Sequence, residues 1–317
     1  MLTTRPSEPT FPGVRRAVKE MLFAVGYYGQ RLAQLEFSGI PILCYHDVRE
    51  SDEQSAPFNE LHVTQRTLAG HCRLLSECCS PISLGDLRAA RAGTRELPPR
   101  AVLVTFDDGY RGVLEYALPV LERYRVPAVV FMCTDPVLRG RHFWFDALCR
   151  RDGERAVLDA RRAPFATWSG VVATSEDAAA PSDSHRPLTA AELLRLAASP
   201  LIEIGGHTMS HPTLALTPPD EQRREIAGCR KWLQDTLEAP IDSFAYPYGG
   251  PEIDYAPDTV RAVREAGFTL AFTTGQSFAT LEGDPFQIPR FVMLDSVDDV
   301  ELAHRLSHSW HGAGEPA

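Results

Sequence analysis

Two adjacent carboxylates, Asp107 and Asp108, follow an apolar run at residues 101–104 and precede Gly109. Adjacent residues of a strand point to opposite faces, so both acids can share one site only where the strand ends and the chain turns. Gly109 permits such a turn because glycine adopts positive φ at little cost. Carboxylates held close together repel each other unless a cation, a proton or hydrogen-bond donors stabilise them. The sequence therefore predicts a charged site at the end of a buried strand.

Candidate partners for these acids are two histidines further along the chain. His207 and His211 are four residues apart, a spacing that can place both imidazoles on one side of a helical turn, and Gly205 and Gly206 precede them. Two histidines and a carboxylate are a common ligand set for catalytic zinc, which keeps one coordination position for water or substrate. The alternative is a polar loop with two unrelated histidines. Combined with the acidic pair, the spacing favours a shared metal site.

The elements that must position these residues alternate between apolar strands and amphipathic helices. Strands are predicted at residues 40–48, 101–104, 126–133, 201–204, 241–245, 269–274 and 288–294, with helical periodicity between most of them. Such alternation indicates an α/β domain with parallel pairing and right-handed crossovers. Polar residues follow several of these strands, His46 and Tyr248 among them. We therefore expect a closed or nearly closed barrel whose chemistry lies at the carboxyl ends of the strands.

Two further segments complete the predicted organisation. Residues 14–35 show an amphipathic helical pattern, so we expect residues 1–37 to be an N-terminal helical extension that packs on a catalytic domain at residues 38–317. The region at about residues 150–188 is rich in Arg, Ala, Ser and Asp without sustained periodicity. We interpret this region as an irregular insertion over one rim of the barrel, either a long loop or a lid.

Composition narrows the location and the partners of the protein. A formal net charge of −10, without clustered Lys and Arg, argues against nucleic-acid binding. No run approaches the ~20 apolar residues of a membrane span, and no small-x-small cleavage site follows the short apolar patch at residues 21–28. Seven cysteines without repeated CxxC spacing favour a reducing compartment over a disulfide framework. We expect a cytoplasmic protein, with peripheral membrane association or export as alternatives; the sequence does not predict the oligomeric state.

Three motifs resemble those of the polysaccharide deacetylases, carbohydrate esterase family four. They are Thr-Phe-Asp-Asp-Gly-Tyr at 105–110, His-Thr-Met-Ser-His at 207–211 and Tyr-Pro-Tyr-Gly at 246–249. The resemblance covers roughly residues 38–295, and the first two motifs are specific. It implies a distorted (β/α) barrel of about seven parallel strands and metal-dependent removal of acetyl groups from N-acetylated sugars. By these motifs, Asp108, His207 and His211 would bind the metal, and Asp107 would be the catalytic base.

The chain departs from the family pattern where an arginine is expected. The third motif of the family usually has an arginine after the aromatic residue of its strand, but here Ala245 follows Phe244. Arg290, on a later predicted strand, is a candidate to orient Asp107 instead.

A second departure concerns the general acid, for which the family usually supplies a histidine in a Leu-x-His motif near the C-terminal end. Leu294 stands where that histidine is expected. The segment Ile-Leu-Cys-Tyr-His-Asp at 42–47 resembles the missing motif moved to the front, an order similar to the circularly permuted poly-N-acetylglucosamine deacetylase branch. Because the first and last strands of a closed barrel are neighbours, His46 becomes the candidate acid.

The resemblance gives each residue a role in amide hydrolysis. A divalent metal, with Zn²⁺ the favoured ion, would lower the pKa of its bound water to about 7 and polarise the carbonyl. Asp107 would accept the water's proton, the backbone N–H of Tyr248 would stabilise the oxyanion, and His46 would protonate the departing nitrogen. Tyr110 and Trp144 would either form a platform for the sugar ring or pack in the core.

The predicted activity is that of a hydrolase of carbon–nitrogen bonds. We expect a metal-dependent N-deacetylase acting on an N-acetylamino sugar in a polysaccharide, oligosaccharide or glycolipid. One alternative is hydrolysis of another amide, imide or ester at the same site. Another is a catalytically impaired, glycan-binding relative, which the absence of arginine at Ala245 suggests.

Overall fold

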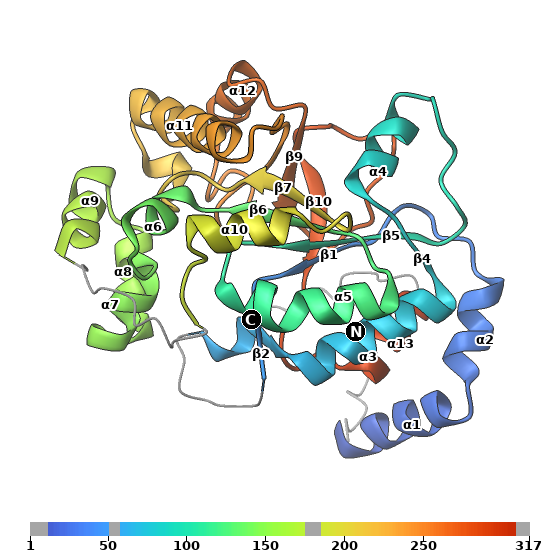
Figure 1. Cartoon of the computed structure of the whole chain (residues 1–317). Coiled ribbons are helices and arrows are strands. Elements are labelled where there is room, and N and C mark those ends of the chain that lie inside the picture. The colour runs from blue at the N-terminus through green and yellow to red at the C-terminus, as the bar shows by residue number, and fades with distance from the viewer. Residues whose placement is uncertain (1–11, 51–57, 175–184, 309–317) are drawn as a thin grey trace, which may run out of the picture.

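Seven parallel strands close into a barrel at the centre of the protein (Figure 1). The computed structural model describes residues 12–50, 58–174 and 185–308. β1 pairs with both β10 and β5, and this double pairing closes the barrel. In chain order the strands are β1 (Ile42–Tyr45), β5 (Ala101–Phe106), β6 (Ala128–Met132), β7 (Ile202–Gly206), β8 (Ser243–Ala245), β9 (Leu270–Thr274) and β10 (Ile288–Val292). The predicted α/β barrel of about seven parallel strands is confirmed.

Three short strands lie outside the closed barrel. β4 (Ser80–Pro81) pairs with the start of β5 and so extends the sheet at the amino end of that strand. β2 (Asp47–Arg49) and β3 (His62–Thr64) pair with each other in a small parallel sheet. Because β2 follows β1 with one residue between them, this small sheet is attached to the carboxyl end of the barrel.

Helices surround the barrel and begin where the sequence offers caps. Ser83 and Thr189 each form a capping box with the residue three positions later, and the side chain of Thr64 accepts from the backbone N–H of Thr67. A π-helical turn at Val113–Ala117 precedes α5, which carries Pro119 in its first turn. The surrounding helices are α3 (Gln65–Cys78), α4 (Leu84–Arg91), α5 (Leu118–Tyr124), α10 (Ala190–Ala197), α11 (Pro219–Leu237), α12 (Pro257–Glu265) and α13 (Asp299–Ser307).

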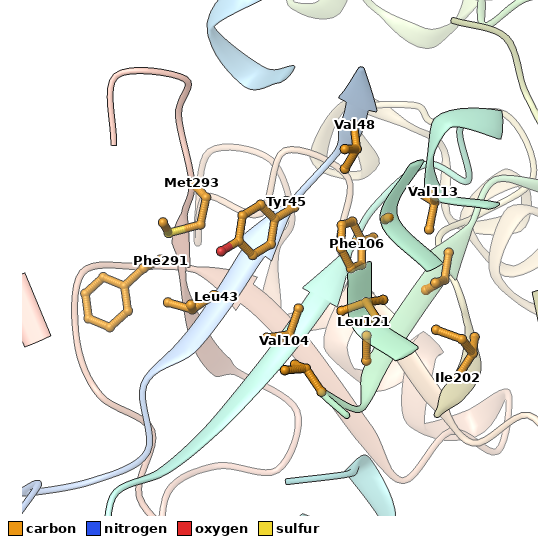
Figure 2. Close-up of a cluster of buried hydrophobic side chains, with 14 of the residues drawn as sticks. Leu43, Tyr45, Val48, Val104, Phe106, Val113, Leu121, Ile202, Phe291 and Met293 are labelled. Atoms are coloured by element: carbon orange, nitrogen blue, oxygen red, sulfur yellow. The ribbon is translucent and has the colours of Figure 1, made fainter. Parts of the chain in front are cut away.

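The strands are buried on both faces because alternate residues pack in two separate cores. Leu43 and Val104 lie in the larger core between strands and helices, part of which Figure 2 shows. Ile42, Leu103 and Phe272 belong to a smaller cluster contributed by six of the seven strands, which fills the barrel. Continuous apolar runs such as residues 101–104 therefore serve both cores at once.

The N-terminal extension is helical, as predicted, but it forms two helices. α1 (Pro12–Ala24) and α2 (Tyr27–Gln34) are separated at Gly26, which adopts a left-handed conformation with φ 74°. α1 is tied to α13 by an ion pair between Lys19 and Glu301 with an N–O distance of 2.6 Å. Residues 1–11 lie outside the described residues.

The prediction of an irregular insertion at about residues 150–188 is wrong over much of its length. The structure has α8 (Glu154–Arg161) and α9 (Phe165–Thr174) there, following α6 (Thr134–Arg139) and α7 (Trp144–Asp152). These helices are short and are held by a satellite cluster of aromatic side chains, including Phe143 and Trp168, so no long periodic pattern marks them. Residues 175–184 of the predicted insertion lie outside the described residues. Within the described part of the chain, no helix combines the length and apolar character that crossing a bilayer requires.

Candidate active site

The predicted polar residues meet at the carboxyl end of the barrel, around one cavity of about 290 Å³. Barrel register explains why residues distant in sequence meet here. Tyr45 pairs with Phe106, and the backbone N–H of Asp107 donates to the carbonyl of Tyr45 over 2.9 Å. His46 and Asp107 are therefore neighbours across two adjacent strand ends. The candidate site residues that line the cavity are His46, Asp107, Asp108, Tyr110, His207, His211 and Tyr248.

Asp108 lies close to both His207 and His211, as a cation held by these three residues would require. Oδ1 of Asp108 lies 3.5 Å from Nε2 of His207 and 3.5 Å from Nε2 of His211. Ligand atoms about 2.1 Å from a tetrahedral zinc ion are about 3.4 Å apart, so these spacings fit. Oδ1 of Asp108 is buried and finds no hydrogen-bond partner among the described residues. The donor set and this buried carboxylate oxygen together fit a divalent metal.

The second nitrogen of His207 fixes the orientation of its ring. Nδ1 donates to the backbone carbonyl of Ala245 over 2.7 Å, which leaves Nε2 facing Asp108. Orienting bonds of this kind are typical of metal-binding histidines. Ala245, where the family arginine is missing, therefore contributes to the site through its backbone.

Backbone strain is concentrated in the loops that carry these ligands. Asp108, Thr208, His211 and Tyr248 all have positive φ, between 60° and 70°. Non-glycine residues rarely adopt this region, and such strain is often found at functional sites. Gly109 continues the turn after Asp108 with φ 91°, and a Cβ there would overlap the side chain of Met132. The predicted turn at the acidic pair is present.

Arg290 forms a buried, bidentate ion pair with Asp107. Nη1 and Nη2 donate to Oδ1 and Oδ2, each over 2.7 Å, and the arginine is 0% exposed. Nη1 also donates to the hydroxyl of Thr105 over 3.1 Å. Arg290 thus contacts Asp107, as expected of a residue that orients this carboxylate.

The two acids have opposite pKa shifts. Burial raises the pKa of Asp107, but the positive charge of Arg290 outweighs burial and holds this pKa well below its usual range. Burial and the negative charge of Asp107 raise the pKa of Asp108 well above its usual range. A bound cation would reverse the second shift because it favours the charged carboxylate. Asp107 is therefore ionised with or without a bound metal, whereas Asp108 becomes ionised when a metal binds.

His46 borders the same cavity beside Asp107. Burial lowers the pKa of His46 to about 4, although the charge of Asp107 acts in the opposite direction. Nδ1 of His46 has no hydrogen-bond partner among the described residues. The imidazole is consequently neutral near neutral pH before substrate binds.

The sequence comparison decides the family. Residues 94–271, more than half of the chain, match the family model described as Polysaccharide deacetylase. The chain belongs to the polysaccharide deacetylase family. It is accordingly a hydrolase that acts on carbon–nitrogen bonds, and its family is metal-dependent.

Individual relatives agree with this assignment. The chain is 22% identical over 253 residues to YxkH of Bacillus subtilis (strain 168), which bears a polysaccharide deacetylase name; the match covers 79% of this chain and 70% of that relative. It is also 22% identical over 253 residues to the poly-beta-1,6-N-acetyl-D-glucosamine N-deacetylase of Escherichia coli (strain K12). That match covers 71% of this chain but only 32% of the relative, so the chain spans about a third of that protein.

A solved structure shares the fold. The Streptococcus pyogenes deacetylase PplD in complex with acetate matches with a TM-score of 0.64 and 19% identity, over 85% of this chain and 99% of that one. The family model, however, includes neither His46 nor Arg290, which lie outside residues 94–271. The geometry of the barrel alone supports a place for these two residues in the site.

Tyr110 and Tyr248 of this deacetylase both line the cavity, but as parts of packed networks. The Tyr110 hydroxyl donates to Oδ2 of Asp146 over 3.0 Å, and the ring is 2% exposed. The ring of Tyr248 contacts that of His211, with centroids 4.6 Å apart, and the guanidinium of Arg161 lies 3.9 Å from its centroid. The buried ring of Tyr110 presents no open face as a sugar platform.

Trp144 does not join the other predicted residues, so the prediction of a platform shared with Tyr110 needs correction. Its ring lines a separate cavity of about 250 Å³ and packs edge-on against Trp168, with centroids 5.7 Å apart. The next residue of α7, Phe145, lines the catalytic cavity instead. Successive helical side chains are rotated by about 100°, so only one of the two can face the substrate.

Several lining residues have no signal in the sequence. His62, Phe145 and Arg161 border the cavity from β3, α7 and α8. None belongs to a recognisable motif, and α8 lies in the region expected to be irregular. Only the packing of the insertion against the barrel reveals them.

Proposed function

We propose that this protein is a metal-dependent N-deacetylase that removes acetyl groups from an N-acetylamino sugar in a polysaccharide, oligosaccharide or glycolipid. The observation that carries this proposal is the juxtaposition of Asp108, His207 and His211 with the ion pair of Asp107 and Arg290 at one cavity. The Escherichia coli relative that acts, by its name, on poly-beta-1,6-N-acetyl-D-glucosamine supports the sugar class.

The first step of the proposed mechanism is attack of water on the amide carbon. Asp108, His207 and His211 would hold a divalent cation, for which we propose zinc, and this cation supplies Lewis-acid activation of water and carbonyl. Asp107 accepts the proton of the attacking water. Arg290 keeps that carboxylate ionised and fixes its direction through two hydrogen bonds.

The second step is departure of the sugar amine. The backbone N–H of Tyr248, in a turn with φ 61°, donates to the developing oxyanion. His46 delivers a proton to the nitrogen as the carbon–nitrogen bond breaks, which gives the amine and acetate. Because burial lowers the pKa of His46 to about 4, the neutral ring would take up a proton from solvent after substrate binds, and the charge of Asp107 favours that uptake.

Acetate release tests the activity. N-acetylglucosamine oligomers incubated with the protein and zinc or cobalt are expected to yield acetate, and Asp107→Asn should reduce the rate about a hundredfold or more. Simple esters and cyclic imides, assayed in parallel, test the competing hydrolytic reactions. Absence of acetate from every acetylated glycan, with retained glycan binding, would instead support the impaired, glycan-binding alternative.

A further inference from the structure

A second buried cluster of ionisable groups adjoins the catalytic cavity and is used by no step above. At its centre is His185, which is 5% exposed and precedes α10. Its Nδ1 lies 2.9 Å from Oδ2 of Asp47, and its Nε2 lies 3.3 Å from Oδ2 of Asp146. The Nδ1 contact is a hydrogen bond, whereas Nε2 lies at ion-pair distance from Asp146 without hydrogen-bond alignment. Two carboxylates this close to one imidazole favour its charged form. The geometry therefore favours an imidazolium that bridges two carboxylates.

This bridge joins two walls of the catalytic cavity. Asp47 opens β2 and directly follows His46, the proposed proton donor. Asp146 belongs to α7, where its neighbour Phe145 lines the cavity. Tyr110, which also lines the cavity, stacks on the ring of His185 with centroids 4.7 Å apart and donates its hydroxyl to Asp146. A movement of His185 would consequently reach both walls.

The charges around His185 are balanced when it is protonated. The guanidinium of Arg49, on β2, interacts electrostatically with both Asp47 and Asp146, so two cations face two buried carboxylates. Burial alone would lower the pKa of His185, but the two carboxylates outweigh burial and raise it to about 9. Two further groups contact His185: the ring of His62 of β3, with centroids 4.6 Å apart, and Arg150 of α7, which donates to the backbone carbonyl of His185 over 3.5 Å.

A metal ion is the competing explanation, because Asp47, His62 and His185 also offer a carboxylate and two imidazoles close together. The separation of 2.9 Å between His185 and Asp47 is that of a charge-assisted hydrogen bond. It is shorter than the spacing of about 3.4 Å between two ligands of a tetrahedral zinc ion. A proton on His185 places a positive charge between the two carboxylates without a metal ion.

We propose that His185 is a positioning residue of this deacetylase, an imidazolium that ties Asp47 to Asp146 and so holds His46 and Phe145 on opposite walls of the cavity. Its effect on turnover rests on the proposed function. The bridge itself is a property of the fold and can be measured without any substrate.

The first experiment measures protonation and metal content. Wild-type protein labelled with ¹⁵N-histidine is titrated by NMR, and the His185 resonances are assigned by their loss in His185→Gln. We expect imidazolium shifts at neutral pH and a transition near pH 9, with one zinc ion per chain after reconstitution. A neutral imidazole at pH 7, or a second zinc ion that His185→Gln removes, would overturn the proposal.

The second experiment measures catalysis. His185→Gln should lower kcat/KM about tenfold to a hundredfold with metal content unchanged, since small misplacements of catalytic groups cost that much. Wild-type kcat/KM should fall above pH 9, and this limb should be absent in His185→Gln. His71→Gln is the matched control, because His71 is a buried histidine that bonds the Tyr45 hydroxyl over 2.9 Å and does not line the cavity.

A second variant covers the case in which His185→Gln does not fold. Asp146→Asn keeps the shape of the side chain but removes one carboxylate, so it should lower the pKa of His185 and move the alkaline limb to lower pH. An unchanged limb in Asp146→Asn, or wild-type kcat/KM and limb in His185→Gln, would refute the positioning role. If wild-type protein releases acetate from no glycan, the proposed function fails while the NMR titration still decides the bridge.

Discussion

Arg290 and Asp107 form a bidentate ion pair, with both N–O distances 2.7 Å, although the two residues are 183 positions apart in the chain. The pair spans the barrel interior from β10 to the end of β5, across the neighbouring strand β1. The pair places a guanidinium beside the proposed base, although Ala245 stands where the family resemblance predicts an arginine. The barrel thus provides from another strand what the family motif usually provides from β8.

Removal of Arg290 tests how the pair contributes to stability and activity. Arg290→Ala leaves a buried carboxylate without its cation, which should lower the free energy of unfolding by about 3–5 kcal/mol. Arg290→Lys keeps the charge but not the two parallel hydrogen bonds, so its loss should be smaller. Urea unfolding of both variants, together with acetate release, measures these effects. Equal stability of Arg290→Ala and wild type would show that the pair contributes nothing.

The barrel and the meeting of Asp108, His207 and His211 at one cavity were predictable because their signals are local. Apolar runs that end in polar residues mark strand ends, and parallel strands bring those ends together, so Asp108 and His207 could be expected at one site. His46 could be placed at the same site only if the barrel is closed, because closure makes the first and last strands neighbours. The family resemblance suggested that placement. Local signals of this kind exist for few other residues of the site.

Residues that depend on long-range packing were not predictable. His185 meets Asp47 across 138 residues, and no motif or period marks His185. α8 and α9 are short, and the sequence predicts an irregular region there, since their stability comes from an aromatic cluster and not from a long apolar stripe. Of the two alternatives for Trp144, a sugar platform and core packing, the structure supports core packing, and the sequence could not decide between them because the helix that carries Trp144 was not predicted.

The roles of His46 and His207 can be separated by two alanine variants. His46→Ala should reduce kcat about a hundredfold or more, as loss of a general acid does, while bound zinc stays near the wild-type amount. His207→Ala should lose zinc and activity together. Metal analysis by mass spectrometry beside acetate release distinguishes the two outcomes. Full activity of His46→Ala would remove His46 from the mechanism.

Glu192 should give the protein part of its acid sensitivity. Its carboxylate accepts from Arg186 over 2.8 and 2.9 Å and closes the capping box of α10 with Thr189. Burial raises the pKa of Glu192, but the bonds from Arg186 and Thr189 outweigh burial and lower it to about 2. A folded-state pKa below the unfolded one means that this stabilisation is present above the ordinary carboxyl pKa of 4.5 and is lost as pH falls toward 2.

Glu192→Gln is therefore expected to flatten the fall in unfolding free energy between pH 4.5 and 2. Chemical denaturation at several pH values measures that slope. Glu265→Gln, which removes an exposed carboxyl group at the end of α12, is the control and should leave the slope unchanged. Parallel slopes for wild type and Glu192→Gln would contradict the assignment.

Gly205 should not tolerate a methyl group. Gly205 lies two residues before His207. A Cβ at Gly205 would lie 2.5 Å from Cδ1 of Phe131 and 2.7 Å from the hydroxyl oxygen of Ser243. Overpacking of this kind costs about 1–3 kcal/mol, and we expect Gly205→Ala to lose that stability and to bind zinc more weakly. Gly170→Ala is the control: it lies within α9 with open space around it and should stabilise the protein by about 0.5–1 kcal/mol. Thermal unfolding and zinc titration of both variants provide the comparison.

Metal removal should destabilise the protein through the cluster of Asp108, His207 and His211. A ligand that binds only the folded state adds RT ln(1 + [L]/Kd), about 2.7 kcal/mol when its concentration is a hundred times Kd. Zinc should therefore raise the melting temperature of chelator-treated wild type, and it should fail to do so in His211→Ala, which keeps only two of the three ligands. In His71→Gln, whose histidine lies outside the cavity, the increase should equal that of wild type. An equal increase in His211→Ala would mean that zinc stabilises the fold from another site.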